Sequence, residues 1–343
     1  MKALAKMEES EGLSLVDWPV PQPGPYDVLI RVKASSICGT DVHIYNWDAW
    51  SQSRIKPPVI LGHEFSGEIV EVGREVTQWK AGDFVSAEGH IVDWTCAACQ
   101  NGQPHLCVNV QVIGIDRNGA FAEYVVVPGE NVWKNPEELP PEIASLQDPF
   151  GNAVHTAYAF DLAGKSVLIT GVGPIGLMTI PVARVAGATQ IIVTDVSEPK
   201  LALAKRMGAD VMLNPVDDDV VAAVQELTGD GADVLLEMSG AAPAITSGLA
   251  ALRPGAEVAL LGVPAKPIEI DWANHVVFKG VTIQAIYGRK IWDTWHRMRA
   301  LLATGAVDLS PLITHDLPLE EFETGFDLMK SRDKVVGKVI LRP

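Results

Sequence analysis

Residues 166–195 read SVLITGVGPIGLMTIPVARVAGATQIIVTD. The apolar run SVLIT predicts a buried strand, GVGPIG a tight glycine turn, the next apolar residues a helix, and IIVTD a second strand. The turn has the pattern G-x-G-x-x-G, which is weak by itself. Here it follows a strand, opens a helix and precedes an acid at the end of the next strand. This context predicts a β-α-β unit that binds a dinucleotide.

The residues of this unit have separate roles in binding. Gly171 permits the tight turn, Gly173 lets the backbone approach a pyrophosphate, and Gly176 permits close packing of helix on strand. Asp195 would accept hydrogen bonds from ribose hydroxyls and repel a 2′-phosphate, which favours NAD over NADP. The alternative is a glycine-rich turn in some other α/β domain.

The pattern around this unit predicts two domains, as a length of 343 residues also suggests. Strand candidates beginning near residues 166, 191, 211, 233, 257 and 282 indicate a parallel sheet covered on both faces, over 151–290. Residues 1–150 show short strands broken by glycine and proline, which predicts an irregular, barrel-like β domain. After residue 290 come two helical stretches and a final strand, and we expect 291–343 to complete the first domain.

Composition excludes some classes of partner. A formal net charge of −16 makes nucleic acid and anionic membrane surfaces unlikely partners. The uncharged stretch 166–183 is as long as a membrane span, but its glycines and prolines favour a strand, a turn and a packed helix. Residues 1–12 lack the apolar run of a secretion signal, and the close trio among the four cysteines suggests metal ligands rather than disulfides. We therefore expect a cytoplasmic protein.

Two separated segments supply donors that suit zinc. Cys38 brings a thiolate, His63 an imidazole and Glu64 a carboxylate. A catalytic zinc site uses about three protein ligands and leaves a position open. Thr40 and His43 follow the first ligand and could carry a proton away from the metal. The alternative is that these are unrelated core and surface residues.

A second donor cluster lies further along the chain. Cys96, Cys99 and Cys107 have the tight spacing of a closed metal site, and Asp93 stands where a fourth ligand would continue that spacing. A carboxylate can complete a tetrahedral zinc site, although it holds zinc less firmly than a thiolate. The alternative is a lobe that keeps its shape through packing and binds no metal.

The motifs CGTDVH (38–43) and GHE (62–64), the cysteine cluster and the later glycine turn together resemble the zinc-containing medium-chain alcohol dehydrogenases. The resemblance implies a GroES-like catalytic domain, a Rossmann domain and a cytoplasmic homotetramer. It implies zinc ligands at Cys38, His63 and Glu64, a proton relay through Thr40 and His43, and a supporting acid at Asp148. It also implies cofactor contacts at Ile175, Asp195, Lys200, Leu261, Gly262, Val263, Ile286 and Tyr287.

More narrowly, residues 38–52, 148–157, 235–241 and 285–289 resemble the L-threonine 3-dehydrogenase branch of that family. The branch oxidises L-threonine with NAD to 2-amino-3-oxobutanoate. Asp93 departs from it, because the branch generally has a cysteine there, and this puts a second zinc in doubt. His90 and Arg289 are candidates for binding the substrate's charged groups. The rival interpretations are a polyol or butanediol dehydrogenase and a catalytically silent nucleotide-binding protein.

Overall fold

The computed structural model describes residues 1–331 and 335–343, and these form two compact units. The first unit comprises Met1–Asp148, Ile313–Ser331 and Lys338–Pro343. The second comprises Pro149–Leu312 and residues 335–337. The second unit is therefore inserted between segments of the first.

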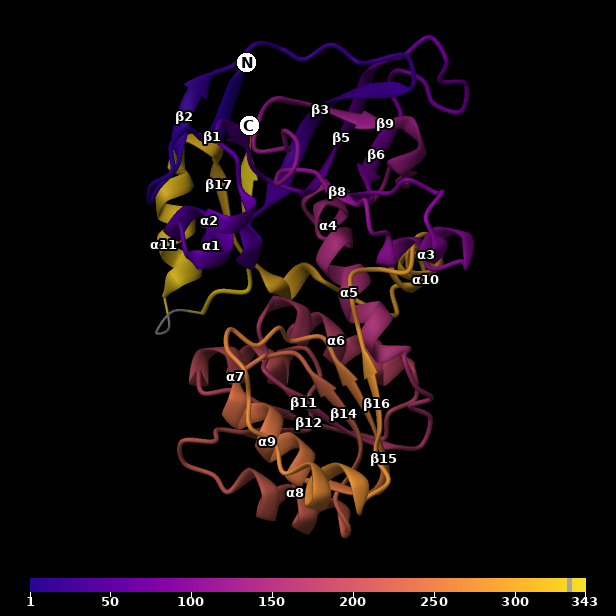
Figure 1. The fold of residues 1–343 in the computed structure, drawn as a ribbon, viewed down its shortest axis with the longest axis vertical. Coiled ribbons are helices and arrows are strands. Elements are labelled where there is room, and N and C mark those ends of the chain that lie inside the picture. Colours follow the sequence, from indigo (N-terminus) through magenta and orange to yellow (C-terminus); the bar gives the residue numbers. More distant parts are fainter. Residues whose placement is uncertain (332–334) are drawn as a thin grey trace. The chain divides into compact units, whose positions relative to one another are not determined.

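The second unit is built on a six-stranded, wholly parallel sheet with the order β13-β12-β11-β14-β15-β16 (Figure 1). The strands are β11 (Ser166–Thr170), β12 (Gln190–Thr194), β13 (Val211–Leu213), β14 (Ala232–Glu237), β15 (Leu252–Leu260) and β16 (Thr282–Ala285). The central strands are apolar and buried on both faces, as the sequence predicted. The expected doubly wound α/β fold is confirmed.

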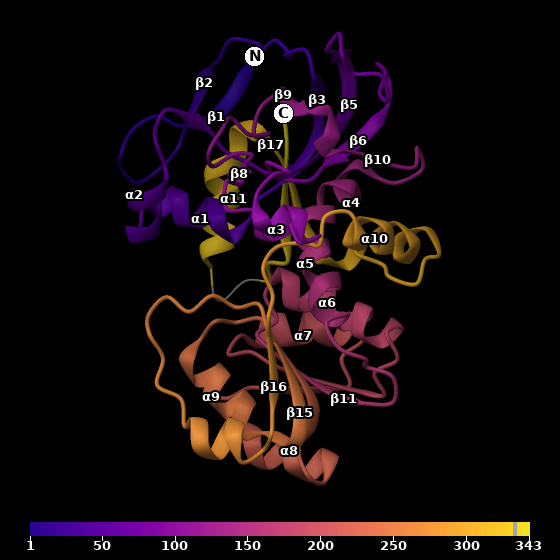
Figure 2. The same ribbon diagram turned by 45° about the vertical axis from the view of Figure 1, so that its right-hand side comes forward.

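Helices cover the sheet in two pairs. The helices α6 (Pro174–Val185) and α7 (Glu198–Arg206) contact each other and the strands β11 to β13. The helices α8 (Val220–Thr228) and α9 (Ala242–Ala250) contact each other and β14. Figures 1 and 2 show α8 and α9 side by side. Their apolar side chains join Leu168, Leu235 and Val258 in one buried cluster, because these three residues are paired in register on the neighbouring strands β11, β14 and β15 and so face the same side of the sheet.

Two more helices of the second unit differ from what the sequence suggested. The helix α5 (Gln147–Ala157) begins at the end of the first unit, and α10 (Asp293–Ala303) follows β16. Residues 291–312 lie in the second unit, whereas we expected them to complete the first. The physical reason is packing: α10 buries Trp295 and Met298, and Arg297 lies over the Tyr158 ring at 5.1 Å. The part of that expectation covering 332–334 lies outside the described residues.

The first unit is an irregular β structure, and the GroES-like class is confirmed. Its largest sheet has the order β10-β6-β5-β3-β18-β17, with β9 also pairing with β3. These strands are β3 (Asp27–Ser36), β5 (Glu64–Val72), β6 (Phe84–Ala87), β9 (Tyr124–Pro128), β10 (Val132–Lys134), β17 (Ile313–Pro318) and β18 (Lys338–Arg342). Smaller sheets contain β1 (Lys2–Lys6), β2 (Ser14–Asp17) and β4 (Val59–Ile60), and then β7 (His90–Ile91) and β8 (Gln111–Val112). The last strand, β18, pairs antiparallel with β3.

Short helices interrupt these strands, more of them than the sequence indicated. They are α1 (Gly39–Asn46), α2 (Ala49–Arg54), α3 (Ala97–Gln100), α4 (Pro141–Ser145) and α11 (Phe322–Lys330), with 3-10 turns at Pro104–Leu106, Gly129–Asn131 and Leu319–Glu321. Of these, α11 lies within one of the two helical stretches expected after residue 290. The others escaped prediction because most are shorter than two turns and carry no long apolar face. Across the described part of the chain, none of the helices has the length and apolar character needed to cross a membrane.

Candidate metal centre and dinucleotide site

The pairing of two strands in the first unit gathers the proposed zinc ligands. Cys38 lies just beyond the end of β3. Glu64 is the first residue of β5 and pairs with Ser36 of β3. One donor atom from each of Cys38, His63 and Glu64 lies within 4.8 Å of the others. His63 and Glu64 are buried, while Cys38 is partly exposed. The three residues that the sequence proposed as ligands therefore come together.

Asp41 lies close to His63, and the sequence motifs had predicted no role for it. It is fully buried, accepts a hydrogen bond from the Cys38 backbone N–H at 2.9 Å, and has its Oδ1 atom 3.9 Å from Nδ1 of His63. The 3.9 Å separation is too long for a hydrogen bond, so Asp41 acts on the His63 ring through its charge. Burial raises the pKa of Asp41 to about 6, against the opposing effect of His63.

The electrostatics around His63 suit a cation. Burial opposes a positive charge on its ring, yet the Cys38 thiolate and the Asp41 and Asp148 carboxylates outweigh burial and raise the pKa of His63 to about 10. Several acids and a thiol therefore require compensation by positive charge at this point. A divalent metal ion would supply it, and thiolate, imidazole and carboxylate are the donors that zinc prefers. The residues present fit the metal.

The two carboxylate oxygens of Glu64 have different surroundings. Its Oε2 atom forms a buried ion pair with Lys338 of β18 and accepts a hydrogen bond from the Ser36 hydroxyl. Its Oε1 atom is buried and has no hydrogen-bond partner among the described residues. Burial opposes ionisation of Glu64, but Lys338 outweighs it and lowers the pKa of the carboxyl. One oxygen is thus held by the protein while the other is left for a metal.

The relay candidates lie on α1, one helical turn apart. Thr40 is partly exposed, and the side chain of His43 is 64% exposed, which suits an outlet to solvent. Nδ1 of His43 lies 2.5 Å from Oδ2 of Asp48, the residue that caps the N-terminus of α2. The carboxylate can hold the ring with its other nitrogen available for proton transfer. Asp148, on α5, is buried and adds to the negative potential at His63.

The second donor cluster is also assembled. Donor atoms of Asp93, Cys96, Cys99 and Cys107 all lie within 4.8 Å of one another, and the Cys96 and Cys99 sulfurs are 3.5 Å apart. Oδ1 of Asp93 accepts the backbone N–H groups of Thr95 and Cys96, and Oδ2 accepts from Asn109 at 2.5 Å. These hydrogen bonds hold the pKa of Asp93 well below its usual range. The cluster therefore keeps an ionised carboxylate beside three sulfurs, a donor set that zinc accepts.

In the second unit, the glycine turn has the geometry that the sequence predicted. Gly171 has a φ of 87°, and a Cβ atom on Gly176 would lie 2.1 Å from the Gly171 carbonyl oxygen. A Cβ atom on Gly173 would meet nothing within 4 Å, so there is open space in front of this residue. Space at the N-terminus of α6 is what a pyrophosphate requires. Oδ2 of Asp195 accepts the Val172 backbone N–H at 3.0 Å, so this acid lies beside the turn.

The remaining cofactor candidates lie at neighbouring loops of the same sheet. The Leu261–Val263 turn follows β15, and the backbone N–H of Ile286 donates to Leu260 at 2.8 Å. Val263 and Tyr287 are exposed, whereas Ile286 is buried. Lys200 is partly exposed on α7, the helix that follows Asp195. These positions share the carboxyl edge of the sheet, where α/β proteins bind nucleotides.

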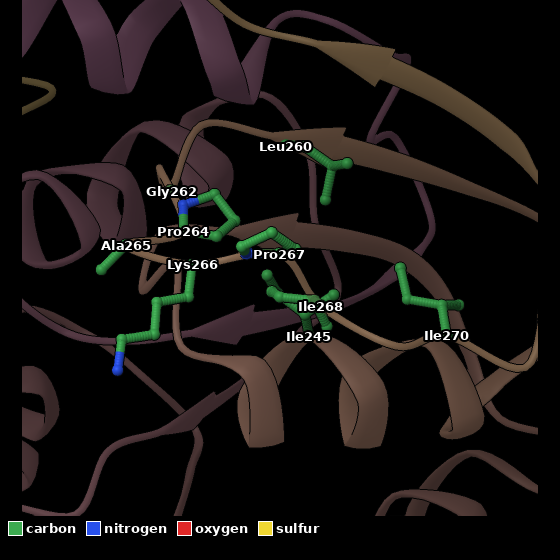
Figure 3. A pocket seen from close by; sticks show the side chains of 9 residues that line it. All are labelled: Ile245, Leu260, Gly262, Pro264, Ala265, Lys266, Pro267, Ile268 and Ile270. Atoms are coloured by element: carbon green, nitrogen blue, oxygen red, sulfur yellow. The ribbon is translucent and has the colours of Figure 1, made fainter.

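An apolar pocket of about 460 Å³ lies beside the Leu261–Val263 turn. Ile245 of α9 and Ile268 and Ile270 of the following loop contribute to its lining, and Figure 3 shows Lys266 pointing away from them. The lining offers no acid, base or metal donor other than Lys266. The pocket is therefore no candidate for acid–base or metal chemistry, although its lining includes Gly262, one of the cofactor candidates.

Comparison with known proteins identifies the family of the chain. The family model for the alcohol dehydrogenase GroES-like domain matches residues 24–137, and that for zinc-binding dehydrogenases matches residues 174–304. The chain is 51% identical to an L-threonine 3-dehydrogenase from Symbiobacterium thermophilum, over 100% of this chain and 98% of that protein. The chain belongs to the zinc-containing medium-chain alcohol dehydrogenase family.

Solved structures of zinc dehydrogenases have the same fold along the whole chain. One is a zinc-binding dehydrogenase from Sinorhizobium meliloti bound to NADP, with a TM-score of 0.92 and 31% identity over 100% of this chain and 99% of that one. Another is 2R,3R-butanediol dehydrogenase from Bacillus subtilis, with a TM-score of 0.89 and 30% identity over 100% and 99%. As a zinc dehydrogenase, the chain is an oxidoreductase that uses zinc and a nicotinamide cofactor.

Three residues of this zinc dehydrogenase escaped the sequence analysis: Asp41, Asp48 and Lys338. Asp41 stands three residues after Cys38, the spacing of a capping box, and this could have singled it out. Asp48 precedes α2 as its N-cap and could have been found in the same way. Lys338 had no local signal, because 274 residues separate it from Glu64.

The cysteine cluster of the dehydrogenase yields a test by metal analysis. If it holds a second zinc, the purified protein should contain close to two zinc ions per chain, and Asp93→Cys should make one of them harder to strip with a chelator. Cys96→Ser should lower the zinc content by one and lower Tm with little effect on kcat, because a structural metal acts on folding. Metal content by mass spectrometry and Tm by calorimetry check this. A wild-type protein with one zinc and an unchanged Tm in Cys96→Ser would show that the cluster is metal-free.

Proposed function

We propose that the chain oxidises the secondary hydroxyl of L-threonine with NAD, giving 2-amino-3-oxobutanoate and NADH. The observation that carries the proposal is the 51% identity, over the whole chain, to an L-threonine 3-dehydrogenase. The butanediol dehydrogenase has the same fold at only 30% identity. The same substrate is supported by the segments around Cys38, Asp148 and Tyr287, which resemble the L-threonine 3-dehydrogenase branch.

The chain's residues divide the chemistry as follows. Zinc, when bound by Cys38, His63 and Glu64, supplies Lewis-acid polarisation that lowers the pKa of the substrate hydroxyl. The Thr40 hydroxyl accepts the proton of that hydroxyl and passes its own proton to His43, which releases it to solvent. The second unit orients NAD, the acceptor of the hydride that leaves the same carbon.

Glu64 is suited to act as an exchangeable ligand. Lys338 and Ser36 hold one of its oxygens, so its negative charge is partly neutralised before any metal binds. A carboxylate in this state would be a weaker donor to zinc than the Cys38 thiolate, and it would be the ligand most easily exchanged for substrate or water. Asp148 would assist by keeping the surroundings negative.

We further propose a second, structural zinc at the Asp93, Cys96, Cys99 and Cys107 cluster, a preference for NAD over NADP, and a cytoplasmic location. The ionised Asp93 carboxylate and the three nearby sulfurs support the second zinc. Asp195 beside the glycine turn supports the cofactor preference. The four free thiols support a reducing compartment.

A homotetramer is the proposed assembly. The strand β16 is the last in its sheet, and Trp272, Val277 and Phe278 just before it are exposed to 56%, 67% and 78%. An edge strand with large apolar side chains beside it favours contact with another chain. A second copy of this chain would cover both the edge strand β16 and the exposed apolar side chains before it.

Activity over a panel of alcohols tests the substrate. NADH formation should be fastest with L-threonine and slow with sorbitol and 2,3-butanediol. Cys38→Ser should reduce turnover roughly a hundredfold or more, because it removes a ligand of the metal that stabilises the reacting oxygen. The same variant should bind NADH normally, since the cofactor residues belong to the other unit. A faster rate with either diol would overturn the substrate assignment, and a fully active Cys38→Ser would overturn the site.

Asp195→Ala should reduce the preference for NAD over NADP by about tenfold or more, which corresponds to roughly 1.4 kcal/mol. The carboxylate both accepts ribose hydrogen bonds and repels a 2′-phosphate, and alanine does neither. The ratio of kcat/KM for the two cofactors, measured for both proteins, decides the matter. An unchanged ratio would remove Asp195 from the cofactor site.

Phe278→Glu should shift the protein from tetramer towards smaller species, because it places a charge on the exposed apolar patch beside β16. Size-exclusion chromatography with light scattering measures the mass of wild type and variant. Tyr26→Glu, at a residue 70% exposed in the other unit, is the matched control and should leave the mass unchanged. A monomeric wild type would contradict the proposed assembly.

A further inference from the structure

Glu237, the last residue of β14, has a carboxyl group that is buried completely and surrounded by hydrogen-bond donors. Oε1 accepts from the Ser239 backbone N–H at 2.9 Å, the Ser239 hydroxyl at 2.5 Å and the Gly240 N–H at 3.1 Å. It also receives a longer contact, 3.4 Å, from the Thr170 hydroxyl. The side chain thus joins the end of β11 to the loop after β14.

The main chain of the same residue joins a third loop. The carbonyl oxygen of Glu237 accepts the backbone N–H groups of Leu261 at 2.9 Å and Gly262 at 3.1 Å. These residues follow β15. Glu237 therefore binds the carboxyl ends of β11, β14 and β15 together, and these are neighbouring strands of the sheet.

The three loops lie in close contact with one another. A Cβ atom on Gly171 would lie 2.6 Å from Cβ of Ser239. A Cβ atom on Gly262 would lie 2.1 Å from the Gly240 nitrogen and 2.4 Å from Oε2 of Glu237. The loops touch backbone to backbone, so a small shift in one displaces the other two.

Stability alone does not explain a carboxyl group here. Burial raises the pKa of Glu237, and the hydrogen bonds from Ser239 and Gly240 only partly oppose it. Its polar partners within the described residues are N–H and O–H groups, with no lysine or arginine among its ion pairs. An apolar residue of similar size is often no less stabilising than a buried charge. The carboxyl group fixes positions that a hydrocarbon could not fix.

We propose that Glu237 is a positioning residue for the dinucleotide: it sets the relative arrangement of the Gly171–Gly176, Ser239–Gly240 and Leu261–Val263 loops that receives NAD. It acts through these loops and does not take part in hydride transfer. The inference rests on the proposed NAD-dependent activity. It assigns a role to a residue that the glycine motif and Asp195 do not include.

The chain contains a matched control at the other end of the same strand. Asp233 of β14 accepts hydrogen bonds from the Ser166 N–H at 2.8 Å and the Ser166 hydroxyl at 2.7 Å, and pairs with Arg253 at 2.6 Å. It therefore links the same three strands, β11, β14 and β15, at their amino ends. Loss of Asp233 should loosen the sheet as loss of Glu237 does, but far from the loops at the carboxyl edge.

The experiment compares Glu237→Gln with Asp233→Asn in the full-length protein. In Glu237→Gln, the amide oxygen can keep the hydrogen bonds that Oε1 accepts, but the N–H₂ group then faces the Gly240 N–H that contacts Oε2 at 3.3 Å and cannot accept from it, so the Ser239–Gly240 loop should shift. The Kd for NADH, measured by fluorescence, should rise about tenfold, the effect expected when a buried N–H donor is left facing another donor. KM for NAD should rise with it, while kcat at saturating NAD, KM for L-threonine and zinc content stay near wild type. Asp233→Asn should lower Tm and leave the Kd within about twofold.

Ser239→Ala keeps the test decisive if Glu237→Gln fails to fold. It removes the hydroxyl that donates to Glu237 and leaves the backbone donors, so the Kd for NADH should rise about threefold. Equal Kd values for wild type, Glu237→Gln and Ser239→Ala would overturn the proposal, as would an equal rise in Asp233→Asn. Failure of the wild-type protein to bind NADH would instead refute the proposed function, so the two failures are distinct.

Discussion

The buried ion pair between Lys338 and Glu64 is the constraint on which the metal centre depends. Both side chains are almost completely buried, and the ammonium group also donates to the Ile37 carbonyl at 3.1 Å. Removing one partner of such a pair leaves an uncompensated charge in the interior, which costs about 3–5 kcal/mol. Here the consequence is greater than for an ordinary pair, because Glu64 adjoins the Cys38 thiol and lies near the Asp41 carboxyl. Without Lys338, several negative groups would share one buried space.

This pair also explains the arrangement of the first unit. Lys338 reaches Glu64 because β18 pairs antiparallel with β3, with Ile340 opposite Ser36, and β3 pairs in turn with β5. The donors then lie at the ends of neighbouring strands, where the chain leaves the sheet. The residues of the second unit's site also lie at the ends of neighbouring strands. There the strands are parallel, so their loops meet at one edge of the sheet, and hydrogen bonds to Glu237 connect those loops. Each site is thus positioned by a buried carboxyl group whose partners come from different strands.

How far the sequence could predict these sites follows from the distance between the interacting residues. The β-α-β unit around Gly171–Gly176 was predictable because its strand, turn and helix signals are contiguous, and the structure has each element in its expected place. Cys38, His63 and Glu64 could be proposed as a set from their chemistry alone. Lys338 could not, because nothing in its own neighbourhood distinguishes it from a surface lysine. The placement of α10 was wrong for a similar reason: Arg297 of α10 contacts Tyr158, which is far away in the sequence, and the sequence of an apolar helix face does not identify the residues that it packs against.

The insertion of the second unit within the first has a consequence for synthesis on the ribosome. Glu64 emerges 274 residues before Lys338, a delay of roughly tens of seconds at usual elongation rates. The parallel sheet of the second unit can therefore fold on the nascent chain while β3 still lacks its neighbour β18. During this interval the carboxylate of Glu64 has no ammonium partner, and the positive charge that compensates it must come from the neighbouring His63 or from a metal ion. A chain that ends prematurely, however complete its nucleotide-binding half, keeps this imbalance permanently.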